Sequence, residues 1–216
     1  MYKEPERISH DEFERRFWNQ YLLHENDFIS SLNYVEFAEE NFETYSIQFV
    51  KQLLSVSSEI ESVLKIMFCN KTKRKSKDGT EYAADKNMVD YIKDLQGLTL
   101  ESSNIENIII KSYRLNYEFV PFKLKPKEET PSWWKNHNKL KHNRSEEYKC
   151  ANLYNLVNAL AGLFLLNYIY FKFLSKDRDQ VDTPNTISKI FKHPFNMNIF
   201  RSEDIYMIGE TINEDE

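Results

Sequence analysis

Residues 156–171 read LVNALAGLFLLNYIYF, and this stretch decides the fold of the 216-residue chain. Only Asn158 and Asn167 interrupt its large apolar side chains, and it contains no proline. A membrane-spanning helix needs about 20 predominantly apolar residues, so a run of this length is more typical of a buried core helix. We therefore predict that residues 150–174 form the central helix and that the chain does not cross a membrane.

Apolar residues at helical spacing predict further helices before this central one. A helix is expected over residues 11–32, with Ser9 or Asp11 as its N-cap. The clearest pattern predicts a helix over residues 42–68, which should pack against the central helix. Its apolar positions are Phe42, Tyr45, Phe49, Leu53, Val56, Ile60, Val63, Leu64 and Met67.

Three shorter segments complete the expected secondary structure. A short helix is predicted over residues 87–95, and another should begin at Pro131 with Thr130 as its N-cap. Residues 107–122 instead alternate between apolar and polar positions, which favours a small two-stranded element. The basic stretch 71–77 and the Asp78-Gly79 pair after it are expected to form an exposed loop.

Composition favours a mainly helical single domain. Aromatic residues make up 14% of the chain, with only 4 Gly and 6 Pro, too few turn-forming residues for a sandwich of many short strands. We predict a helical domain over residues 1–177 and an irregular C-terminal extension over residues 178–216, packed on the same domain. In that extension Phe191, Phe195, Phe200, Ile205 and Tyr206 could contact the body.

The charge distribution is uneven although the net charge is only -5. Both ends of the chain are acidic, whereas residues 71–77 and residues 123–144 are basic. The second basic stretch holds seven Lys or Arg against Glu128 and Glu129. Such stretches form either a solvated face or a surface that binds phosphate, and the sequence leaves both interpretations open.

Several classes of protein lack support in the sequence. The charged N-terminus shows no secretory signal, and Cys69 and Cys150 do not form a Cys-x-x-Cys pair. We therefore expect reduced thiols and a cytoplasmic protein. No set of zinc ligands and no standard phosphate-binding or hydrolase motif is visible, so we expect no metal and no cofactor.

Three asparagines, Asn152, Asn155 and Asn158, recur every three residues at the start of the central helix. Buried amides need hydrogen-bonding partners. We expect this stripe to face polar groups of another helix or of a second subunit.

The densest group of chemically versatile residues is SWWKNHNKLKHNR over residues 132–144. On a helix, Asn138, Lys141 and His142 share one face, and Arg144 follows near the helix end. Histidine transfers protons near neutral pH, and cationic side chains hold phosphate or stabilise developing negative charge. These are the groups that metal-free RNA cleavage requires, with His142 as acid or base, Lys141 and Arg144 on phosphate, and Asn138 positioning them.

A purely structural interpretation of the same segment stays open. Trp133 and Trp134 at a helix start are more often core anchors than platforms for bases. A Lys-His-Asn-Arg run at a helix C-terminus also complements the helix dipole. In that case Glu59, on the helix over residues 42–68, would pair with the basic segment.

Residues 40–175 are similar to a group of bacterial proteins that resemble the HEPN superfamily. The most specific part of the resemblance is the pattern Trp-Trp-x-x-x-Asn-x-x-Lys-His-x-Arg over residues 133–144. The resemblance implies an up-down helical bundle that often forms homodimers. It also implies metal-independent endoribonuclease activity in a toxin–antitoxin or phage-defence system, with RNA as substrate and an antitoxin as partner.

The resemblance carries over to the site only at His142. The family motif places four to six residues between Arg and the histidine, and at those positions this chain has Lys135, Asn136 and His137. Other members of the superfamily are non-catalytic. The sequence therefore leaves open whether the chain is an RNase, a protein- or nucleotide-binding regulatory module, or a domain in which this segment is only structural.

Overall fold

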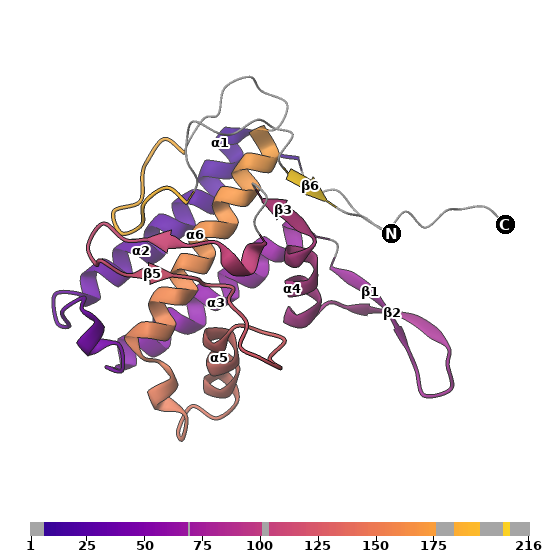
Figure 1. Ribbon diagram of the computed structural model, residues 1–216, viewed down its shortest axis with the longest axis horizontal. Helices are drawn as coiled ribbons and strands as arrows, with labels where there is room; N and C mark the ends of the chain where they lie inside the picture. Colours follow the sequence, from indigo (N-terminus) through magenta and orange to yellow (C-terminus); the bar gives the residue numbers. More distant parts are fainter. Residues whose placement is uncertain (1–6, 69, 101–103, 176–183, 195–204, 208–216) are drawn as a thin grey trace.

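The computed structural model describes residues 7–68, 70–100, 104–175, 184–194 and 205–207. Within them the protein is mainly helical, as predicted, and its strands form only small two-stranded sheets. Figure 1 shows the longer helices arranged around helix α6 (Leu153–Ser175). Three short 3-10 helices lie in the connections, η2 (Glu39–Asn41), η3 (Ile105–Asn107) and η4 (Tyr148–Cys150).

Helix α6 is the predicted central helix, and it is the most buried element. All but three of its 23 residues are buried, and Leu163, Phe164 and Tyr170 are completely excluded from solvent. By length and composition this helix could span a membrane, but 94% of its most apolar 18-residue stretch is buried inside the protein. Its apolar side chains therefore form the core rather than an outer surface.

Helix α3 (Ile47–Met67) packs along α6, as predicted, but begins five residues later than expected. Ser46 caps it by accepting a hydrogen bond from the Phe49 N–H at 3.1 Å. The carbonyls of Phe42 and Thr44 accept hydrogen bonds from the first backbone N–H groups of α6. Residues 42–45 therefore lie in a turn that leads to the Tyr45–Asn152 bridge and not in α3, and their carbonyls satisfy donors at the start of α6 that have no partner within that helix.

The first helical segment follows the prediction closely. It consists of α1 (His10–Phe13), the π-helical turn η1 (Glu14–Trp18) and α2 (Asn19–Ser31). The hydroxyl of Ser9 accepts a hydrogen bond from the Glu12 N–H, so Ser9 is the N-cap. The wider π turn accommodates one extra residue. Phe17 and Trp18 are consequently both buried, and the Trp18 indole N–H donates to the Thr186 carbonyl at 2.7 Å.

Residues 184–194 of the C-terminal extension pack on this first helix. The buried Glu25 carboxylate accepts a hydrogen bond from the Tyr21 hydroxyl at 2.7 Å and one from the Lys189 N–H at 3.0 Å. Phe191 is buried against the core. Phe195, Phe200 and the expected boundary at residues 177–178 lie outside the described residues.

Short strands appear in more places than the sequence indicated. Strands β4 (Ile110–Lys111) and β5 (Glu118–Phe119) pair antiparallel, which gives the predicted small element in a much shorter form. Strand β3 (Leu98–Leu100) follows helix α4 (Met88–Gln96) and pairs with β6 (Ile205–Met207). The extension is therefore not wholly irregular, because part of it is strand β6.

The prediction of an exposed loop at the basic stretch is wrong. Strands β1 (Lys71–Lys75) and β2 (Glu81–Asp85) form an antiparallel hairpin there. Gly79 takes a positive φ of 90° in its turn, a conformation that glycine adopts easily. The Asp78 carboxylate accepts hydrogen bonds from the Ser76 hydroxyl and the Thr80 N–H, which lower its pKa to about 2. The Asp-Gly pair was a hairpin signal.

Candidate functional site at the end of helix α5

Helix α5 (Ser132–His142) carries the predicted site, and its start is fixed by a proline. The backbone N–H groups of Trp134 and Lys135 donate to the Pro131 carbonyl at 3.0 and 3.1 Å. Pro131 is therefore the N-cap, and no side chain caps the helix. The prediction of Thr130 as the cap was wrong by one residue.

The first turn of α5 belongs to the core. Trp133 and Trp134 are 3% and 7% exposed, and their rings meet edge to face. The Trp133 indole N–H donates to the Pro121 carbonyl at 2.6 Å. The prediction that these two residues anchor the helix is confirmed, and neither ring is available to stack on a base.

The two histidines of α5 have opposite environments. His137 is buried, its ring packs on Trp134 at a centroid distance of 4.7 Å, and its Nδ1 has no hydrogen-bonding partner. The pKa of His137 is lowered to about 4, first by burial and then by the nearby Lys141 and His142, against the opposing effect of Glu61. His142, five residues on, is exposed, and its side chain makes no hydrogen bond or ion pair with any described residue. Only His142 is therefore accessible to a ligand.

Three of the four predicted site residues line one open hollow of about 620 Å³, which we call the α5-end hollow. They are Lys141, His142 and Arg144, and all three are exposed. The full lining is Leu54, Leu140, Lys141, His142, Asn143, Arg144, Ser145 and Tyr148. The fourth predicted residue, Asn138, is half-buried one turn earlier and does not line the hollow, so a positioning role for it has no support in the geometry.

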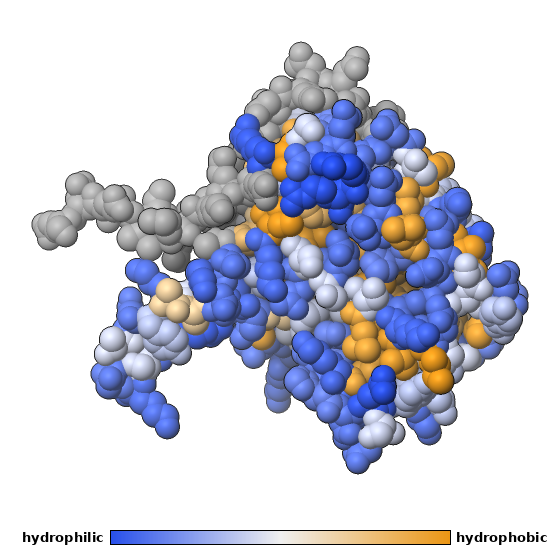
Figure 2. Space-filling view, turned by 180° about the vertical axis from the view of Figure 1, so that it is seen from behind, coloured by the Kyte–Doolittle hydropathy of each residue, from blue (hydrophilic) through white to orange (hydrophobic). Residues whose placement is uncertain are grey.

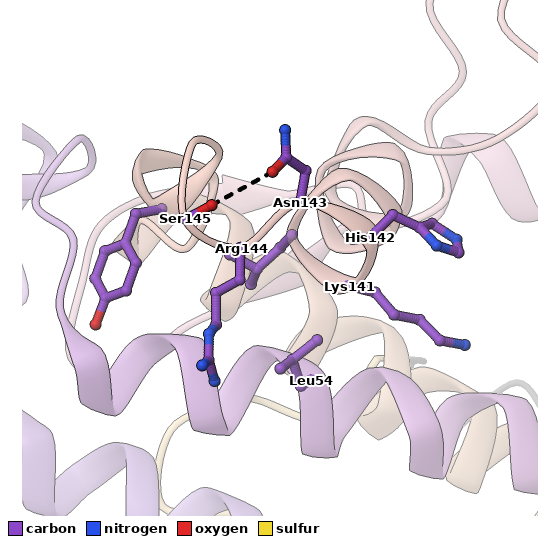
Figure 3. A pocket seen from close by; sticks show the side chains of 8 residues that line it. Leu54, Lys141, His142, Asn143, Arg144 and Ser145 are labelled. Carbon is purple, nitrogen blue, oxygen red and sulfur yellow. Dashed lines mark hydrogen bonds between the residues drawn. The ribbon is translucent and has the colours of Figure 1, made fainter.

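The cations of the hollow diverge from one another. In Figure 3 Lys141 and His142 extend to one side of the helix end, whereas Arg144 extends over helix α3 beside Leu54. Arg144 has left the helix, because Asn143 forms the C-cap with φ -142° and its N–H donates to the Lys139 carbonyl. This arrangement suits a ligand with several separated negative charges better than a single phosphate.

Sequence reasoning missed the residues that close the hollow on its other sides. Asn143 donates to the Glu146 carboxylate at 2.6 Å and accepts from the Ser145 hydroxyl at 3.5 Å, which orders the loop after the helix (Figure 3). Leu54 of α3 lies beside the Arg144 side chain in Figure 3, and Tyr148 also lines the hollow. Asn143 lay within the motif, but nothing in the sequence indicated that Leu54 or Tyr148 would meet it.

The carboxylate near α5 is not the one expected. Glu59 is half-buried, its pKa is raised by that burial, and it forms no ion pair among the described residues. Glu61 is the acid that acts on His137, and it also forms an ion pair with Lys65 at 2.8 Å. The basic end of α5 is therefore not neutralised by Glu59, and the predicted pairing was wrong.

The asparagine stripe of α6 finds its partners within the chain. The Asn155 and Asn158 amides donate to the Cys150 and Tyr154 carbonyls at 2.9 and 2.8 Å. The Asn152 amide donates to the Glu43 carboxylate at 3.0 Å. These donors consequently need neither another α-helix nor a second subunit, the two partners expected from the sequence, because the carbonyls of Cys150 and Tyr154 and the Glu43 carboxylate satisfy them.

Metal-binding groups and thiols are two further kinds of chemical group that could form a site. Among the described residues no group of three or more His, Cys, Asp or Glu side chains could hold a metal ion. The half-buried Cys150 thiol is free and donates to the Glu147 carboxylate, and burial raises its pKa. Cys69 lies outside the described residues.

The α5-end hollow could support binding of an anionic polymer and one proton transfer. Cleavage of RNA by general acid–base catalysis uses one group to take the 2′-hydroxyl proton and another to protonate the leaving oxygen. With His137 buried, His142 is the only accessible imidazole on α5. Comparison of the chain with protein-family models, with curated proteins and with solved structures gave no significant match.

Proposed function

We propose that this protein binds RNA through the α5-end hollow. The observation that carries the proposal is that Lys141, His142 and Arg144 lie together, exposed and without bonds to any other described side chain. Positively charged groups in such a position bind phosphates and release counterions. Their divergence favours a polynucleotide backbone over a mononucleotide, because neighbouring phosphates of a strand can meet different cations.

On the basis of the resemblance to HEPN proteins, we also propose that the helices form an up-down bundle and that the protein forms homodimers. A two-fold dimer that places two copies of His142 in one cleft would supply both an acid and a base. Metal-independent RNA cleavage in a bacterial defence or toxin system, with an antitoxin as partner, is the specific form of the proposal. The exposed, unbonded imidazole of His142 is the observation that favours cleavage over binding alone.

The test of binding compares single-stranded RNA affinities of the parent protein and variants. Lys141→Gln and Arg144→Gln should each weaken binding at low salt and reduce the slope of log K against log salt by about 0.7 per lost phosphate contact. Lys93→Gln, on the exposed face of α4, is the matched control because it removes the same charge elsewhere. If the control weakens binding as much as the site variants, the α5-end hollow is not the RNA site.

The test of cleavage uses His142→Ala on a mixed RNA pool in the presence of EDTA. The parent should cleave, and the variant should be slower by about 10²–10⁴, the usual contribution of a positioned acid–base group. His142→Lys, which keeps a cation but removes the imidazole, should bind RNA without restoring the rate. Binding without cleavage by the parent would establish the non-catalytic alternative, a regulatory module that uses the same surface.

The test of assembly is the mass in solution. A homodimer at micromolar concentration should give twice the chain mass of 25.9 kDa by light scattering. A monomer at high micromolar concentration would remove the two-histidine cleft, and with it the proposed route to cleavage, but would leave RNA binding intact.

A further inference from the structure

The β1–β2 hairpin is a projecting ribbon with no core of its own. Figure 1 shows it extending away from the helices, and the opposite face in Figure 2 shows the same projection with a largely hydrophilic surface. Its two strands pair only with each other among the described strands. An isolated two-stranded hairpin is marginally stable in water, so this one depends on attachment at its base.

Two ion pairs provide that attachment to helix α4. Arg74 Nη2 lies 2.6 Å from Asp90 Oδ2, and Lys86 Nζ lies 2.6 Å from Asp94 Oδ2. Asp90 also completes the capping box at the start of α4, which fixes its position. Lys86 therefore ties the base of the ribbon to α4, and Arg74 ties strand β1 to the same helix nearer the turn, while the other cations of the ribbon remain exposed.

The net charge of the ribbon is positive, whereas the net charge of the whole chain is negative. Residues 71–85 contain five Lys or Arg and three Asp or Glu, a net charge of +2 in a chain of net charge -5. The three carboxylates are already engaged, since Asp85 pairs with Lys71, Glu81 with Lys75, and Asp78 accepts hydrogen bonds in the turn. Uncompensated positive charge remains on the other cations.

Lys73 and Lys77 are those cations. Both are exposed, and neither forms an ion pair with a described residue. Lys73 stands opposite Ala83 in the register, so no large side chain covers it. On the other face of the ribbon Tyr82 stands opposite Arg74 and is 50% exposed. The ribbon therefore presents unpaired cations on one face and in the turn, and an accessible aromatic ring on the other face, so a strand that crosses the ribbon could contact both. Cations and accessible aromatic rings are the elements that bind single-stranded nucleic acids.

We propose that the β1–β2 hairpin is a second RNA-binding surface, in which Lys73 and Lys77 bind phosphates and Tyr82 stacks on an unpaired base. The inference rests on the proposed function in taking RNA as the ligand. A single strand fits better than an A-form duplex, whose deep and narrow major groove does not admit such a ribbon. A protein partner fits less well, because the ribbon lacks the apolar patch found at the centre of protein interfaces.

Binding of labelled RNAs about 5 and about 25 nucleotides long tests the inference, because one binding surface covers only about 4–16 nucleotides. The Lys73→Gln/Lys77→Gln variant should bind the long RNA about tenfold more weakly at low salt, with a salt slope smaller by about 1.4. Its affinity for the short RNA should equal that of the parent. Lys93→Gln/Lys189→Gln, which removes two exposed cations elsewhere, is the matched control and should retain parental affinity.

The aromatic contact is tested separately from the charges. Tyr82→Leu should lose about fivefold or more in affinity for the long RNA, the lower end of the contribution of one stacked base. Tyr82→Phe keeps the ring and should bind like the parent. Equal binding by Tyr82→Leu and Tyr82→Phe would overturn the stacking role.

Three outcomes separate this inference from the proposed function. If Lys141→Gln/Arg144→Gln loses RNA affinity while both hairpin variants match their controls, the hairpin inference is wrong and the proposed function stands. If the parent binds neither RNA, both fall. If the hairpin variants bind the long RNA like the parent but bind polyglutamate more weakly than the parent, the ribbon binds an acidic polypeptide and not RNA. The inference is then overturned.

Discussion

Helices α5 and α6 pack on one another, yet the polar side chains of α6 and of the last turn of α5 are engaged in opposite ways. In α6 the Asn158 and Asn167 amides donate to carbonyls of their own helix, and nearly every other side chain is buried. At the end of α5, Lys141 and His142 are exposed and make no such bonds. The comparison separates the region that holds the fold together from the region whose groups remain available for a ligand.

The same contrast appears within α5 itself. Its first turn is fixed by the Trp133 bond to Pro121 and by the packing of Trp134, while its last turn reaches the surface. His137 and His142 mark the two sides of this division. Substitutions on the two sides should therefore change different measurable quantities, and three predictions test that separation.

The largest effect is expected in α6. Leu163→Ala should lower the free energy of unfolding by about 2–5 kcal/mol, because it removes buried methyl groups and leaves a cavity. Leu23→Ala is the matched control, since Leu23 is 57% exposed and should change stability by less than about 0.5 kcal/mol. Chemical denaturation measures both. A loss below about 1 kcal/mol for Leu163→Ala would place the core elsewhere.

An intermediate effect should depend on pH through His137. Its pKa of about 4 in the folded protein lies below the ordinary value of 6.5 in an unfolded chain. Between these values the unfolded chain binds a proton that the folded protein does not, so stability falls as the pH is lowered through this window. We expect a loss of about 1–2 kcal/mol, less than the full difference in pKa would give because nearby solvent screens the charge.

His137→Leu should remove that part of the pH dependence, measured by denaturation at about pH 7 and about pH 4.5. The pKa of His24 is also lowered by burial, so the difference between parent and variant isolates His137. His142→Leu is the comparison on the exposed side and should change the pH dependence much less than His137→Leu, because His142 is the smallest of the causes that shift the pKa of His137. If His137→Leu and the parent lose stability equally in acid, His137 is not held neutral.

The smallest effect on stability is expected at the α5-end hollow. Lys141→Ala and Arg144→Ala should each change the free energy of unfolding by less than about 0.5 kcal/mol, because neither side chain is in an ion pair within the described structure. Thermal denaturation checks this directly. Destabilisation by more than about 1 kcal/mol would show that these cations serve mainly to complement the helix end, as the structural interpretation holds.

Local sequence determined much of this protein because the relevant forces act between neighbours in the chain. The long apolar run gave a central buried helix, the periodic residues of α3 gave its packing partner, and Ser9 gave the first N-cap. The exposure of His142 beside Lys141 also follows from local properties, since polar residues at the end of an amphipathic helix extend from the core. Those features could be predicted without any knowledge of the tertiary fold.

Only the tertiary structure decided the features that depend on distant contacts. Residues 42–45 lie outside α3 because the start of α6 donates hydrogen bonds to the Phe42 and Thr44 carbonyls, and Asn152 donates to Glu43 rather than to a second subunit. Leu54 reaches the hollow only because α3 packs beside α5. The periodicity of the sequence does not predict these contacts, because they join residues that are far apart in the chain. A buried polar group bonds to whichever partner the whole fold brings close to it.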